Sequence, residues 1–236
     1  MQRITSLFDY FKKYEQSVKD PEKFWAEIAD TFIWKKKWDK VLDWDFDSVD
    51  IKWFKNAKLN ITENILEKTL KGRGDKTAIS WEPNNPTEPS IRLTYKELYE
   101  ETCKFSNALR EKGIKKGDRV IIYMPMVPEA AIAMLACARV GAVHSVVFAG
   151  FSSTSLADRI NDCQAKMVLT SDGNFRGNKT IPVKPVVDEA LEKCKTIESV
   201  VVLERTKQKI NMTSGRDFWW HDCIPVSYTH LRAHET

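Results

Sequence analysis

The spacing of apolar and polar positions changes near residue 118. From there on, short runs of β-branched and aromatic residues alternate with segments in which apolar residues recur every three or four positions. We expect strands at 120–123, 143–148, 167–170 and 200–203, and helices at 128–139, 153–162 and 183–194. Strands that alternate with helices at this spacing predict a parallel sheet with right-handed crossovers, which places the chain in the α/β class.

The first 60 residues follow a different pattern. Five of the eight tryptophans lie here, among lysines and aspartates. Asp20 and Pro21 suit the start of a helix, and the apolar residues after them have helical spacing. We therefore expect a tryptophan-rich helical arm over residues 1–60. Beyond the arm, apolar spacing predicts helices at 60–70 and 94–113 and a strand at 77–81, and Thr94 and Glu97 form a capping-box pattern.

Composition narrows the range of partners. The 37 basic and 33 acidic residues nearly cancel, so the chain has no large basic field for nucleic acid. Its five cysteines are widely spaced, which indicates free thiols in a reducing compartment and argues against a metal or disulfide framework. The longest apolar run, 130–138, is too short to span a bilayer, and the first residues contain no apolar signal core. We expect a cytoplasmic protein with neither a nucleic-acid nor a membrane partner.

Candidate chemistry lies in three loops that follow predicted strands, at 124–127, 149–152 and 171–180. Ligands bind outside the carboxyl ends of the strands in an open parallel sheet. The third loop contains two glycines and carries Arg176 and Lys179. Cations beside free backbone N–H groups suit a phosphate group, although the spacing excludes a Walker P-loop. On the residues alone, an exposed turn with solvated charges is the stronger interpretation.

Three other patterns have simpler explanations. His144 lies within a predicted strand without an evident acidic or thiol partner, and the Trp-Trp-His-Asp sequence at 219–222 has no recognisable nucleophile. Trp34 and Trp38 flank three lysines, as stacking aromatics do in a single-strand binder, but five aspartates follow within twelve residues. We interpret the first two as packed side chains and the last as part of a solvated arm. No catalytic residue and no metal ligand is assigned.

Two consecutive segments, Tyr123–Ala130 and Ala133–Phe148, closely resemble the acetyl-CoA synthetases. These are AMP-forming acyl-CoA ligases of the adenylate-forming superfamily. Collinear matches extend from about Asp20 to Cys223. The resemblance implies the first part of the parallel-sheet N-terminal domain of an adenylate-forming enzyme, with a partial AMP-binding domain over residues 61–225 after the arm.

The resemblance also implies a reaction and a site. Acetate and MgATP would form an acetyl-adenylate, and the thiol of coenzyme A would then displace AMP. In the family, the segment after Thr-Ser-Asp contributes to coenzyme A binding, and here its second arginine is replaced by lysine, which keeps the charge but loses the bidentate fork. The residues that the resemblance assigns to coenzyme A are Arg176, Gly177, Asn178 and Lys179, together with Phe148, Ala149 and Gly150 from a second segment, where Ala149 replaces a common glycine.

The resemblance covers only the N-terminal part of the family pattern. The family's ATP-phosphate loop, acyl pocket and C-terminal lid have no counterpart here, so we expect an N-terminal fragment that is inactive by itself. Residues 226–236 depart from the family and resemble a translated sequencing adapter, which would put the native end near Ile224 or Pro225. The alternative is a non-catalytic α/β module that binds coenzyme A or a nucleotide.

Overall fold

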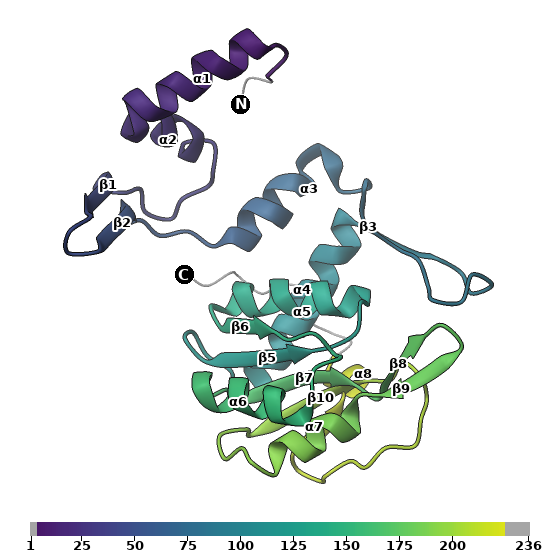
Figure 1. The fold of residues 1–236 in the computed structure, drawn as a ribbon. Coiled ribbons are helices and arrows are strands. Elements are labelled where there is room, and N and C mark those ends of the chain that lie inside the picture. Colours follow the sequence, from purple (N-terminus) through teal and green to yellow (C-terminus); the bar gives the residue numbers. More distant parts are fainter. Residues whose placement is uncertain (1–3, 225–236) are drawn as a thin grey trace.

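The computed structural model describes residues 4–224, in which a parallel sheet packs between two layers of helices (Figure 1). The adapter-like segment, 226–236, lies outside the described residues. The sheet has the order β6-β5-β7-β10-β11, and all neighbouring strands are parallel. Its strands are β5 (Arg119–Tyr123), β6 (Val143–Val146), β7 (Met167–Ser171), β10 (Ser199–Leu203) and β11 (Asp217–Trp219). The predicted α/β class is confirmed.

Both faces of the sheet are apolar because helices cover both. Helices α4 and α5 pack on one face, and α6 and α7 pack on the other (Figure 1). Along β5, Val120 and Ile122 contact the first layer, whereas Ile121 and Tyr123 contact the second, as the alternation of side chains in a strand requires. The helices are α4 (Tyr95–Glu111), α5 (Pro128–Val140), α6 (Ser153–Cys163), α7 (Lys184–Leu191) and the short α8 (Trp220–Cys223).

Several local predictions agree with the structure in the type of element, with differences in the bounds. The capping box is present: the Thr94 hydroxyl accepts from the Glu97 N–H at 3.2 Å, and the Glu97 carboxylate accepts from the Thr94 N–H at 2.7 Å. The strand predicted at 143–148 ends two residues earlier, and α7 is shorter than the predicted 183–194. Strand β11 was not predicted, because three residues are too few to show a period.

The arm contains two helices and a hairpin, which is more structure than the single helix predicted. Its elements are α1 (Leu7–Lys19), α2 (Pro21–Ala29), β1 (Lys40–Asp45) and β2 (Asp50–Lys55). Asp20 caps α2 by accepting from the Lys23 N–H at 3.1 Å. The rings of Trp34, Trp38 and Phe54 lie 5.2–5.5 Å apart, and each lysine between the two tryptophans forms an ion pair with an acidic residue. These contacts support the interpretation of an arm with solvated lysines.

A buried arginine joins the segment after the arm to the domain. Arg139, on α5, is 1% exposed; its guanidinium lies 2.7 Å from Glu67 and 5.3 Å from the ring of Tyr99. Burial is the largest single influence and would lower the pKa of Arg139, but the hydrogen bond to Glu67 and the attraction of nearby acidic groups together outweigh it, and the pKa is raised. The helix predicted at 60–70 is present as a π-helical turn, η1 (Glu63–Glu67), followed by α3 (Lys68–Arg73). A two-stranded sheet follows, made of β3 (Thr77–Trp81) and β4 (Ile91–Thr94).

All five cysteines are free thiols, as predicted. Cys137 is fully buried on α5, and burial raises the pKa of its thiol to about 12, so this side chain is an apolar part of the core. Among residues 4–224, no helix is both long enough and apolar enough to cross a membrane.

Candidate functional site

The connections of the sheet diverge between β5 and β7. Numbered along the chain, the strand order is 2-1-3-4-5, and the helices that follow β5 and β7 pack on opposite faces. In such sheets, the point where the connections diverge is the usual place for a ligand, outside the carboxyl ends of the strands. The three loops singled out in the sequence follow β5, β6 and β7, and therefore lie along this edge.

The prediction of a loop at 171–180 is wrong, because this segment forms most of a β-hairpin. Strands β8 (Gly173–Arg176) and β9 (Lys179–Pro182) pair antiparallel and leave Gly177 and Asn178 as a two-residue turn. Gly177 has φ +55°, a value that favours glycine at the first position of a type II′ turn. The hairpin extends from the carboxyl end of β7 toward solvent (Figure 1).

Two cations flank the hairpin turn. Arg176 and Lys179 are directly paired in register, so their side chains lie on the same face, with about 5 Å expected between their Cβ atoms. Both residues are exposed, and within residues 4–224 neither side chain has a hydrogen-bond or ion-pair partner. Like charges directly opposite each other destabilise a hairpin. An anion between them would relieve this repulsion, which makes the face a candidate phosphate site.

The backbone of the turn is less available than the sequence suggested. The expectation of free N–H groups is wrong for Gly177, whose N–H donates to Asn84 Oδ1 at 3.2 Å. The Asn84 side-chain amide also donates to the Gly177 carbonyl at 2.8 Å. Any ligand at this tip would therefore rely on the side chains of Arg176 and Lys179 rather than on the Gly177 N–H.

A buried carboxylate holds the base of the hairpin. Asp172 is fully buried, and its oxygens accept backbone N–H groups from Gly173 at 2.7 Å, Arg205 at 2.8 Å, Thr206 at 3.0 Å and Gln208 at 3.2 Å. Backbone donors compensate the cost of burying this charge. Asp172 thus fastens the segment after β10 to the end of β7, and its role is structural.

The second predicted segment, Phe148 to Gly150, forms a turn just beyond β6. The Phe151 N–H donates to the Phe148 carbonyl at 3.0 Å, and the Tyr123 hydroxyl donates to the Phe151 carbonyl at 2.7 Å, which ties the turn to the end of β5. Phe148 is 72% exposed and Ala149 is half-buried. A Cβ on Gly150 would overlap the Phe148 ring, so glycine is what allows the ring its present position.

The sheet places the two segments on one edge without bringing them into contact. Strands β6 and β7 are both neighbours of β5, and the usual strand spacing puts them about 10 Å apart. Arg176 and Lys179 lie farther from β6 still, at the tip of the hairpin that follows β7. The arrangement could hold an extended anionic ligand along the edge. The two segments, 148–150 and 176–179, contain no histidine, carboxylate, serine or cysteine.

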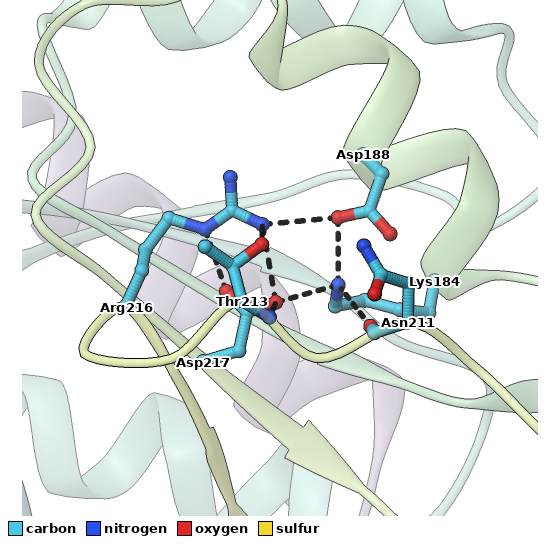
Figure 2. Close-up of polar contacts among 6 residues, drawn as sticks. All are labelled: Lys184, Asp188, Asn211, Thr213, Arg216 and Asp217. Atoms are coloured by element: carbon cyan, nitrogen blue, oxygen red, sulfur yellow. Dashed lines mark hydrogen bonds and ion pairs between the residues drawn. The ribbon is translucent and has the colours of Figure 1, made fainter.

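A second charged cluster lies between α7 and the start of β11 (Figure 2). The fully buried Lys184 ammonium lies 2.6 Å from Asp188 and 2.8 Å from Asp217, and Arg216 contacts Asp217 at 2.6 Å and Asp188 at 3.1 Å. Burial would raise the pKa of Asp217, but hydrogen bonds from Arg216 and Lys184 outweigh it and lower the pKa. Every charge here has a counterion, so the cluster is structural.

The weaker sequence candidates remain outside the edge site. His144, on β6, is half-buried, and burial lowers its pKa. Trp220 is buried and stacks on Phe105 with ring centroids 3.7 Å apart, which supports a packed role for the 219–222 sequence. Among residues 4–224, no group of three His, Cys, Asp or Glu side chains could hold a metal ion.

Sequence reasoning missed three residues that shape the edge: Asn84, Asp172 as a backbone anchor, and Arg205. The Arg205 guanidinium lies between two aromatic rings, 5.1 Å from that of Trp81 and 4.8 Å from that of Phe175. These contacts join positions far apart in the chain, and the local sequence of each contains only an ordinary loop signal. The hairpin itself did have a signal, since a Gly-Asn pair between two short runs is typical of a two-residue turn.

Comparisons with known proteins agree with this fold. Residues 66–230 match the family described as AMP-binding enzyme, and residues 10–65 match the family described as acetyl-coenzyme A synthetase N-terminus. In fold, the chain is similar to acetoacetyl-CoA synthetase from Streptomyces lividans, with a TM-score of 0.83 at 24% identity over 94% of this chain and 33% of that one.

Curated relatives named acetyl-coenzyme A synthetase are similar in sequence. The protein from Bdellovibrio bacteriovorus is 50% identical over 90% of this chain, and the one from Vibrio vulnificus is 52% identical over 90%. This chain covers 33% of each, so it spans about a third of the length of the curated relatives it matches. Because the family match includes more than half of its residues, the chain belongs to the AMP-binding enzyme family.

Proposed function

We propose that this chain is the N-terminal part of an AMP-forming acetate–CoA ligase. In the reaction, acetate attacks the α-phosphorus of ATP to give acetyl-adenylate and pyrophosphate, and the thiol of coenzyme A then attacks the acetyl carbonyl and releases AMP. Membership of the AMP-binding family and the names of relatives about 50% identical support this proposal. The arm over residues 1–60 and the partial domain over 61–225 are the units that this chain contributes.

Within that reaction, we assign the carboxyl edge of the sheet to coenzyme A. The observation that carries this assignment is the pair of exposed cations, Arg176 and Lys179, which face the same side of the hairpin without a counterion among residues 4–224. Coenzyme A is a polyanion, and an arginine and a lysine together offer a fork and a point charge to its phosphates. The turn from Phe148 to Gly150 would contact another part of the same extended molecule.

The residues of this chain have a smaller role toward acetate and ATP. Magnesium enters this proposal only with ATP, since the described residues, 4–224, contain no group of side chains suited to a metal ion. The two segments assigned to coenzyme A, 148–150 and 176–179, carry no histidine, carboxylate, serine or cysteine that would transfer a proton or act as a nucleophile. The contribution of residues 1–225 is therefore to bind and orient coenzyme A.

The test is a steady-state assay of the full-length enzyme that extends this reading frame. We expect AMP formation that requires acetate, ATP and coenzyme A together, and pyrophosphate release that requires only acetate and ATP. Propionate in place of acetate measures the preference for the acyl group. Tight binding of coenzyme A with no AMP formed from any acyl substrate would contradict the ligase and favour a non-catalytic binding module.

A further inference from the structure

The loop between β3 and β4 lies against the tip of the β8–β9 hairpin (Figure 1). The contact is made by one side chain. Asn84 donates to the Gly177 carbonyl at 2.8 Å and accepts from the Gly177 N–H at 3.2 Å, so one amide satisfies both polar backbone groups of one residue. A primary amide carries a donor and an acceptor side by side, so it can do both at once.

The loop that carries Asn84 is itself anchored. Trp81, at the end of β3, donates its indole N–H to the Met126 carbonyl at 2.8 Å, in the loop after β5. The Arg205 guanidinium stacks on Trp81 and on Phe175 of β8, with its charged group 5.1 Å and 4.8 Å from the two ring centroids. The end of β3 and the loop after it therefore contact the hairpin at two places: at β8 through Arg205, and at the turn through Asn84.

Gly177 is the residue through which Asn84 can affect the two cations. It follows Arg176 directly, and it belongs to the two-residue turn that sets the register between Arg176 and Lys179. A two-stranded hairpin is only marginally stable in water, and two like charges opposite each other weaken it further. Fixing the Gly177 peptide keeps both side chains on one face although they repel each other.

We propose that Asn84 is a positioning residue for the ligand held by Arg176 and Lys179. Its amide acts through Gly177 and does not itself need to touch the ligand. The inference rests on the proposed assignment of this tip to coenzyme A. It predicts that Asn84 affects the binding of coenzyme A and not the adenylation of acetate, because both hydrogen bonds lie at the tip of the hairpin.

The test compares three variants of the full-length enzyme, and coenzyme A is the probe. We expect Asn84→Ala to raise the KM for coenzyme A by about three- to tenfold, the effect of losing one or two ordinary hydrogen bonds. We expect kcat and the KM values for ATP and acetate to change by less than about twofold. Asn161→Ala is the matched control, because Asn161 also donates its amide to a distant backbone carbonyl, that of Lys193, away from the hairpin. Arg176→Ala removes one of the two cations, and its KM for coenzyme A tests the proposed ligand site itself.

A second measurement records the structural part of the proposal. Hydrogen exchange at the Gly177 amide should accelerate by at least about tenfold in Asn84→Ala and stay unchanged in Asn161→Ala. If exchange accelerates while the KM for coenzyme A stays constant, or if kcat falls with all KM values raised, the positioning role is wrong. If Arg176→Ala also leaves the KM for coenzyme A unchanged, the assignment of the tip to coenzyme A fails as well, which separates the two failures.

Discussion

Two groups of basic residues lie close together in the chain and have opposite surroundings. Arg176 and Lys179 face each other at the tip of a hairpin, exposed and without an acidic partner among residues 4–224. Lys184 lies five positions later, is fully buried, and contacts two aspartates at 2.6 and 2.8 Å. In the sequence, all three look like solvated charges. The difference supports the proposal that the exposed pair serves a ligand, whereas Lys184 serves the fold.

The physical basis of this contrast is desolvation. A buried charge must be compensated inside the protein, and the cluster of Figure 2 supplies Asp188, Asp217 and the Asn211 carbonyl around the Lys184 ammonium. An exposed pair of like charges needs no such compensation. Its repulsion lowers the stability of the fold somewhat, and no internal ion pair offsets that loss. Unpaired cations at a strand's carboxyl edge are therefore better candidates for function than paired ones nearby.

The largest effect should come from the buried cluster. Asp217→Ala leaves Lys184 and Arg216 with one aspartate between them, and breaking a buried ion pair costs about 3–5 kcal/mol. We expect the free energy of unfolding, measured by urea titration, to fall by about that amount. Arg176→Ala serves as the control, with an expected change within about 0.5 kcal/mol. Equal losses in the two variants would remove the distinction between the groups.

Acid pH should weaken the buried cluster selectively. The pKa of Asp217 is lowered in the folded state, so the unfolded chain binds more protons as the pH falls below about 4. The stability due to this carboxylate is complete above its unfolded pKa and is lost as the pH falls through its folded pKa. We expect the gap in unfolding free energy between the unchanged chain and Asp217→Asn to narrow from pH 5 to pH 3. A constant gap would show that the carboxylate is not stabilised by its partners.

The parts of the fold that depend on local periodicity could be predicted from the sequence. The strand at 120–123, the helix from Pro128 and the capping box at Thr94 need only neighbouring residues, and the parallel class follows from their alternation. The position of the candidate site at the carboxyl edge followed from the same pattern. The hairpin at 173–182 was missed because its polar composition suggested a loop, although its Gly-Asn turn was visible.

The contacts that give the site its shape could not be predicted. Asn84 and Gly177 are 93 positions apart, and Lys184 and Asp217 are 33 apart. Neither pair has a local pattern, because each depends on how the loops meet after the sheet has formed. Lys184, at the start of a helix, looks like any solvated lysine until the fold brings Asp217 beside it. Burial and pairing, which separate structural charges from functional ones, are properties of the tertiary structure.

The central claim is that the two unpaired cations bind coenzyme A, and one measurement tests it most directly. In the full-length enzyme, the double variant Arg176→Ala/Lys179→Ala should raise the KM for coenzyme A by at least about tenfold, equivalent to about 1.4 kcal/mol. Its unfolding free energy should be equal to that of the unchanged enzyme or slightly higher, because the repulsion between the two charges is removed, and its rate of acetate-dependent pyrophosphate release should not change. An unchanged KM for coenzyme A in a folded, adenylating double variant would contradict the claim.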